Sequence, residues 1–93
     1  MRAGYSEQEI TEGLSSLPGW QYDGSQIART FEFESFLGGI EFVRRVADAA
    51  EAADHHPDID IRYSSIAIAV SSHDVGGITD RDFRLAAEIN ALV

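Results

Sequence analysis

The apolar residues of the segment 36–53 recur at three- and four-residue spacing, which is the period of an α-helix. They are Phe36, Ile40, Val43, Ala47 and Ala50. The charged residues of the segment lie largely on the other side of the helical wheel. Because Pro57 holds His56 in an extended conformation, the helix has to end near Asp54. A long central helix therefore divides the 93-residue chain into two halves.

Shorter helices are predicted near both ends of the chain. Ser6 stands three residues before Glu9, and Thr79 stands three residues before Asp82. At this spacing a capping hydroxyl and a returning carboxylate satisfy each other's backbone donors. The first helix should cover about residues 6–17, where a proline-glycine pair stops it. The last helix should begin after Thr79 and continue to the end of the chain.

Each half of the chain also carries a predicted hairpin. In the first half, residues 20–22 meet residues 26–33 across Asp23-Gly24, a pair that tolerates positive φ. In the second half, residues 59–63 alternate between apolar and charged or polar side chains, and residues 66–72 are rich in β-branched residues. We place their turn at Ser64-Ser65. The order helix, hairpin, helix, hairpin, helix indicates one α+β domain over residues 1–93.

The composition excludes several classes of function. Sixteen acidic residues stand against seven basic ones, and the formal charge of −9 repels phosphate backbones, so we expect no nucleic-acid binding. No apolar run approaches membrane-spanning length, and the first residues contain no apolar signal core, so we expect neither a membrane segment nor export. The absence of cysteine fits a reducing compartment, and a cytoplasmic location is the default expectation.

All three histidines of the chain, His55, His56 and His73, belong to the predicted second hairpin region. Imidazole titrates nearest neutral pH, so clustered histidines suit proton transfer in both directions. A turn at Ser64-Ser65 sets His56 opposite His73 across the two strands. The end of the central helix and the acidic residues Glu51, Asp54 and Asp58 favour the imidazolium form.

These residues carry a resemblance that extends over nearly the whole chain. The pattern Glu51-x-x-x-His55-His56-Pro57, followed by Tyr63, His73, Gly77-Ile78-Thr79 and Asp82, resembles the signature of the pterin-4a-carbinolamine dehydratase family. Trp20 and the aromatic residues of the segment 31–42 also match it. The family fold is a four-stranded antiparallel sheet with helices packed on one face, in the order α-β-β-α-β-β-α. The pair Gly38-Gly39 departs from the family pattern and touches helix packing.

The resemblance implies an enzyme that removes water from a 4a-hydroxytetrahydropterin, without cofactor or metal. It implies that His55, His56 and His73 line the pterin site and carry the proton transfers. We expect His55 to be the acid toward the leaving hydroxyl, His73 to be the base or a second acid, and His56 to bind and share protons. The predicted contacts around them are Asp82, Glu51, Asp54 and Tyr63. The resemblance also implies a homodimer or homotetramer, with a pterin-dependent hydroxylase as a further possible partner.

Alternative interpretations accompany these residues. A histidine metal site is one, although adjacent histidines rarely both reach one ion. Asp82 has an equal claim to a structural role in the capping box. A residue such as Glu51 is more often a solvated charge, and one such as Tyr63 is more often a packing aromatic. The alternative function is a protein-binding or assembly module, a role that some relatives in this family have. Retention of all three histidines favours catalysis.

Overall fold

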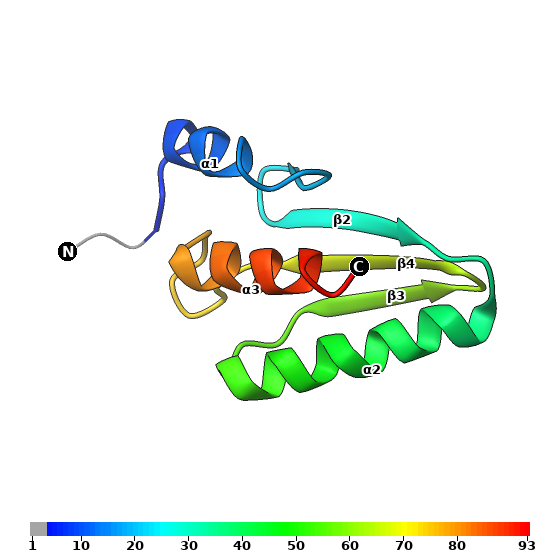
Figure 1. Cartoon of the computed structure of the whole chain (residues 1–93). Coiled ribbons are helices and arrows are strands. Elements are labelled where there is room, and N and C mark those ends of the chain that lie inside the picture. Colours follow the sequence, from blue (N-terminus) through cyan, green and yellow to red (C-terminus); the bar gives the residue numbers. More distant parts are fainter. Residues whose placement is uncertain (1–3) are drawn as a thin grey trace.

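The structure is a computed structural model that describes residues 4–93, and these residues form three helices and a four-stranded antiparallel sheet (Figure 1). The helices are α1 (Glu7–Leu14), α2 (Phe36–Ala53) and α3 (Asp80–Asn90). The strands are β1 (Gln21–Tyr22), β2 (Ile27–Glu32), β3 (Asp58–Arg62) and β4 (Ser65–Val70). The strand order is β1-β2-β4-β3, so β1 and β3 are the edges. The predicted α+β class and element order are confirmed.

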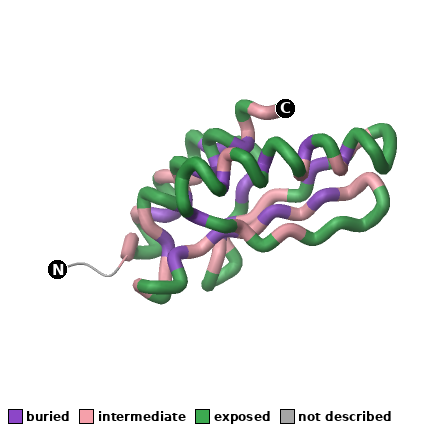
Figure 2. Tube along the Cα trace, turned by 90° about the horizontal axis from the view of Figure 1, so that it is seen from below, coloured by how far each residue is buried: buried purple, intermediate pink, exposed green. Residues whose placement is uncertain are grey.

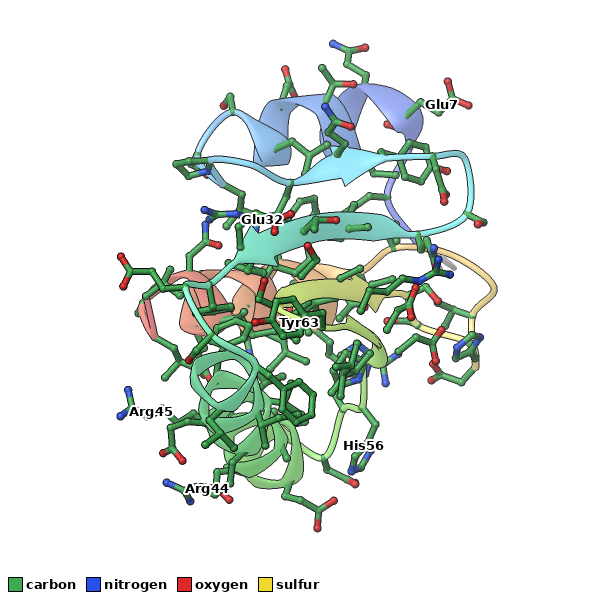
Figure 3. All side chains as sticks on the ribbon, turned by 90° about the vertical axis from the view of Figure 1, so that its right-hand side faces the viewer. Glu7, Glu32, Arg44, Arg45, His56 and Tyr63 are labelled. Carbon is green, nitrogen blue, oxygen red and sulfur yellow. The ribbon has the colours of Figure 1, made fainter. Side chains whose placement is uncertain are left out.

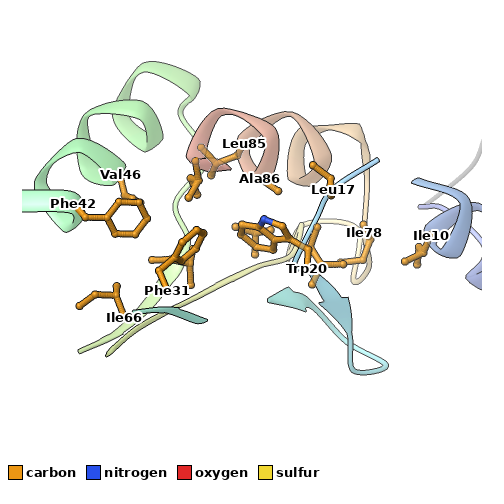
Figure 4. Close-up of a cluster of buried hydrophobic side chains, with 14 residues drawn as sticks. Ile10, Leu17, Trp20, Phe31, Phe42, Val46, Ile66, Ile78, Leu85 and Ala86 are labelled. Atoms are coloured by element: carbon orange, nitrogen blue, oxygen red, sulfur yellow. The ribbon is translucent and has the colours of Figure 1, made fainter. Parts of the chain in front are cut away.

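The helices lie in one layer over one face of the sheet (Figure 2). Residues directly opposite each other in antiparallel strands share a face, and the pairs Ile27–Val70 and Phe31–Ile66 bring the apolar residues of β2 and β4 together. Side chains from α2 and α3 complete the core, among them Phe42, Val46, Leu85, Ala86 and Ile89 (Figure 4). Burial of each large apolar side chain stabilises the fold by about 1.5–3 kcal/mol.

The first helix is shorter than predicted. Ser6 and Glu9 form the expected capping box, but α1 ends at Leu14 rather than near residue 17. Ser15 and Ser16 follow, and their hydroxyls donate to the carbonyls of the preceding turn, at Glu12 and Gly13. Serine side chains of this kind compete with the helical hydrogen-bond ladder, and the apolar spacing does not report that competition.

The turn of the second hairpin is also displaced from its predicted position. Arg62 pairs with Ser65, so the two-residue turn is Tyr63-Ser64 rather than Ser64-Ser65. Tyr63 has a φ of 52°, in the left-handed region that such a turn requires. Pairing stops at Asp58–Ala69, and the predicted pairing of His56 with His73 is therefore wrong.

The first hairpin has a four-residue loop, 23–26, rather than a connection by Asp23-Gly24 alone. The Asp23 carboxylate accepts hydrogen bonds from the backbone N–H groups of Ser25 and Gln26, and these bonds lower the pKa of that carboxyl. Within residues 4–93 no helix combines the length and the hydropathy needed to cross a membrane.

Candidate active site

The end of α2 sends the two adjacent histidines in different directions. Asp54 caps the helix in the left-handed conformation, with a φ of 50°, and the His55 backbone N–H donates to the Ala50 carbonyl at 3.1 Å. This sharp turn buries His55, whose exposure is 9%, and leaves His56 exposed. The two imidazoles therefore have separate environments, despite being neighbours in the sequence.

Asp82 lies in the first turn of α3 and is fully buried. Its Oδ1 lies 2.6 Å from Nε2 of His55. Its Oδ2 accepts one hydrogen bond from the Thr79 backbone N–H and one from the Ser72 hydroxyl, both at 2.9 Å. A carboxylate surrounded by donors is an acceptor only, so His55 donates from Nε2 and its Nδ1 is left for another partner. Asp82 thus closes the capping box and orients an imidazole.

His73 is exposed and lies on the turn 72–77 that follows β4. The Ser72 N–H donates to the Gly77 carbonyl at 2.8 Å, which closes this turn. Asp74, beside His73, forms an ion pair with Arg81 of α3 at 2.7 Å. The Arg81 hydrogen bond lowers the pKa of the Asp74 carboxyl, and the charge of His55 acts in the same direction. The turn that carries His73 is therefore held near His55.

Two cavities of about 230 Å³ border this network. His55 lines the first, together with Arg81, Arg84 and Glu88 of α3. Ser72 and His73 line the second. Asp82 bonds to one lining residue of each cavity, since it contacts both His55 and Ser72. The buried carboxylate thus connects the cavity that His55 lines with the cavity that His73 lines.

The remaining predicted residues lie further out. Glu51 contacts His56, with 2.5 Å between Oε2 and Nε2, and both side chains are exposed. Asp54 is an exposed helix cap. Tyr63 lies on the β3–β4 turn, whereas His56 lies beyond the other end of β3, so about 20 Å of strand separates them. Figure 3 looks nearly along the strands, so the two labelled side chains appear near each other in that view. Within residues 4–93 no three His, Asp or Glu side chains are arranged to hold a metal ion.

The sequence interpretation missed Ser72. A signal for it exists, because Ile66, Ile68 and Val70 alternate along β4 toward the core and Ser72 continues that alternation. Ser72 has an exposure of 1%, and a polar side chain at such a position requires a buried partner. That partner is Asp82.

Comparisons with known proteins show the family of the chain. The family model described as Pterin 4 alpha carbinolamine dehydratase matches residues 3–92. The chain belongs to this family. A relative from Acidobacterium capsulatum is 52% identical over 84 residues, which are 90% of this chain and 91% of that one. A relative from Roseiflexus castenholzii is 47% identical over the full length of both chains. Both are named "Putative pterin-4-alpha-carbinolamine dehydratase".

Two solved structures resemble the structure of this protein. A transcriptional coactivator/pterin dehydratase from Brucella melitensis has a TM-score of 0.91 at 34% identity, over 96% of this chain and 97% of that one. A pterin dehydratase-like protein, identified as a RuBisCO assembly factor in the alpha-carboxysome, has a TM-score of 0.64 at 22% identity. That alignment covers 78% of this chain and 84% of the other, and it shows a shared fold only.

Proposed function

We propose that this protein dehydrates a 4a-hydroxytetrahydropterin to the quinonoid dihydropterin by histidine acid–base catalysis. The bond between C4a and its hydroxyl oxygen breaks, N5 loses its proton, and a C4a–N5 double bond forms as water leaves. One group has to protonate the departing oxygen and another has to accept the N5 proton. No electron is exchanged with an external partner in this step.

The observation that carries the proposal is the contact between buried His55 and buried Asp82 at 2.6 Å. A carboxylate on Nε2 stabilises the imidazolium and fixes the ring, so Nδ1–H is the proton that His55 donates to the leaving hydroxyl. His73, on the adjoining turn, is the base or a second acid. His56, in contact with Glu51, binds the substrate and shares protons.

Turnover of synthetic 4a-hydroxytetrahydropterin by the purified protein tests the proposal. We expect His55→Ala and His73→Ala each to lower the dehydration rate by on the order of 10²-fold or more, the scale of one acid–base group. His55→Gln should lose the same activity with less effect on folding, because its amide still donates to Asp82. Glu41→Gln, on the exposed face of α2, serves as the control.

Equal rates in the wild type and in both histidine variants contradict the mechanism. Stoichiometric zinc in protein prepared without added metal would instead support the metal-site interpretation.

A second candidate function is a protein-binding module. The name of the Brucella structure includes transcriptional coactivator, and this chain exposes large apolar side chains at Phe36 and Leu37 of α2. Exposed apolar residues of this kind favour a protein partner over DNA in a chain of charge −9. A folded wild-type protein without dehydratase activity would favour this alternative.

A further inference from the structure

A chain of hydrogen bonds leads to Asp82, and each bond in it runs from donor to acceptor in the same sense. The Arg81 backbone N–H donates to the Thr79 hydroxyl oxygen at 3.3 Å, and that oxygen lies 2.8 Å from the Ser72 hydroxyl. The Ser72 hydroxyl donates its one proton to Asp82 Oδ2. The Thr79 hydroxyl is therefore the donor to Ser72. Successive donors that point the same way polarise one another, so the last bond, from Ser72 to the carboxylate, is strengthened.

A hydrogen-bond donor on Oδ2 of Asp82 weakens the hydrogen bond that the carboxylate accepts at Oδ1. The Ser72 proton draws negative charge away from Asp82, and the carboxylate then holds the His55 Nε2–H less tightly. An imidazolium that is held less tightly by its partner releases its proton more readily. The geometry thus connects the hydroxyl of Ser72 to the acid strength of His55 through one buried side chain.

We infer that Ser72 is a positioning residue that, through Asp82, sets how readily His55 gives up its proton. The inference rests on the proposed function, in which His55 is the acid. Ser72 also closes the turn of His73, since its N–H and its carbonyl both bond to Gly77. The side chain and the backbone of Ser72 therefore hold buried His55 and exposed His73 in position relative to each other.

Other charged groups also face His55. Asp82, Arg81, Arg84 and Glu88 face it from α3, Asp74 from the turn after β4, and Asp54 precedes it in the chain. Removal of the Ser72 hydroxyl leaves the charges of all these groups in place. A change in the titration of His55 in a Ser72 variant therefore reports the hydrogen bond to Asp82.

The test combines NMR with kinetics on the full chain. In Ser72→Ala we expect the ¹⁵N signals of the His55 ring to titrate at a pH higher by roughly half to one unit than in the wild type. The alkaline limb of the pH–rate profile should move in the same direction. The kcat should fall severalfold with little change in KM, because a weaker acid slows proton transfer and not binding.

Matched variants separate this role from simple packing. Ser72→Thr keeps the hydroxyl and should restore both the titration and kcat. Ser72→Cys, a weaker donor, should give an intermediate shift if Ser72→Ala does not fold. Ser65→Ala removes a serine hydroxyl that donates to an exposed carboxylate, Glu32, at the other end of β4, and should change neither readout.

Two results overturn the inference. One is a folded Ser72→Ala whose His55 signals titrate as in the wild type. The other is an equal shift in Ser65→Ala. The NMR readout does not require dehydratase activity, so an inactive wild-type protein contradicts the proposed function while the inference about Ser72 is still decided by the ring signals.

Discussion

At the scale of the residue, the structural contacts of Asp82 cannot be separated from the chemical role that the proposed function gives it. A fully buried carboxylate is tolerated only where donors surround it, and three segments supply those donors: the segment after α2 through His55, the turn after β4 through Ser72, and the N-terminus of α3 through Thr79. The capping box that the sequence predicts is therefore also the support of the buried histidine.

The individual site residues were predictable to different degrees. The histidines and Asp82 were predicted as site residues because their residue types and spacing match a known pattern. Ser72 was not found, because serine at the end of a strand is common and only its burial makes it distinctive. The expected role of Tyr63 depended on its being close to the histidines. Within a single chain, the whole length of β3 separates Tyr63 from His56.

The rate of the proposed dehydration should pass through a maximum near neutral pH and fall on both sides. The proposed reaction needs a protonated donor and a neutral acceptor at the same time, and histidines supply both forms only around neutrality. The two limbs belong to the coupled histidine set rather than to single residues. Steady-state rates measured between about pH 5 and 9 check this prediction, and a flat profile in that range contradicts histidine acid–base chemistry.

At the scale of the element, apolar spacing predicted the extent of the central helix but not its buried face, and polar detail decided the turns. The segment 36–53 is helical as predicted, but the helix buries Gly39, Phe42, Val46 and Ala50, so Ala50 alone of the predicted stripe is buried. Gly39 is buried there, and a Cβ on it would lie 3.1 Å from Cδ1 of Ile66. Close packing against β4 therefore accounts for Gly39, whereas nothing in the sequence between Arg62 and Ser65 identified the residue with positive φ.

The ion pair between Asp74 and Arg81 fastens the His73 turn to α3, and we predict a pH-dependent stability from it. The pKa of Asp74 is lowered in the folded state by the Arg81 hydrogen bond. The contribution of this ion pair to the free energy of unfolding is therefore fully present above the pKa of aspartate in the unfolded chain, near 4. It is lost as the pH falls through the lower pKa that Asp74 has in the folded state. Asp74→Asn should be less stable than the wild type at pH 7 and should match it near pH 2.

Urea unfolding at both pH values measures this difference. Arg81→Gln should show the same loss at pH 7, and the double variant should lose little more than either single variant, because both changes break one contact. Since the two side chains are exposed, the difference should shrink at high salt. A deficit in Asp74→Asn that persists unchanged at pH 2 would mean that the ion pair is not its cause.

At the scale of the whole molecule, the sheet leaves β3 as a complete open edge. A strand edge presents unpaired backbone donors and acceptors, and β3 contains neither lysine nor proline, which commonly block pairing. Large apolar side chains are exposed around it, with Ile61 at 42% and Tyr63 at 72%. The opposite edge strand, β1, has only two residues. The sequence predicts residues 27–33 or residues 59–63 as the pairing edge, but residues 27–32 form the inner strand β2, so β3 offers the longer of the two edges.

We predict that two copies pair through β3 about a twofold axis. In an antiparallel register with Ile61 opposite Ile61 of the second copy, Asp60 faces Arg62 on both sides of the axis, and no like charges meet. A shift by one residue on each strand sets Asp60 against Asp60, which is unfavourable. This register also places Tyr63 opposite Ile59 of the second copy, so the exposed ring is partly covered in the dimer.

Sedimentation at micromolar concentration should show a species of at least twice the 10.2 kDa chain mass. Asp60→Arg sets one arginine against Arg62 of the partner on each side of the twofold axis and should give monomers. Asp60→Arg combined with Arg62→Asp restores the complementary pairs and should restore the dimer. Asp48→Arg, on the exposed face of α2, controls for the change in net charge.

A wild-type monomer contradicts this assembly and directs attention to exposed Gly38, because Gly39 is occupied in packing against Ile66. A wild-type dimer that tolerates Asp60→Arg instead excludes β3 pairing in this register, and the exposed apolar residues of α2 are then the next surface to test.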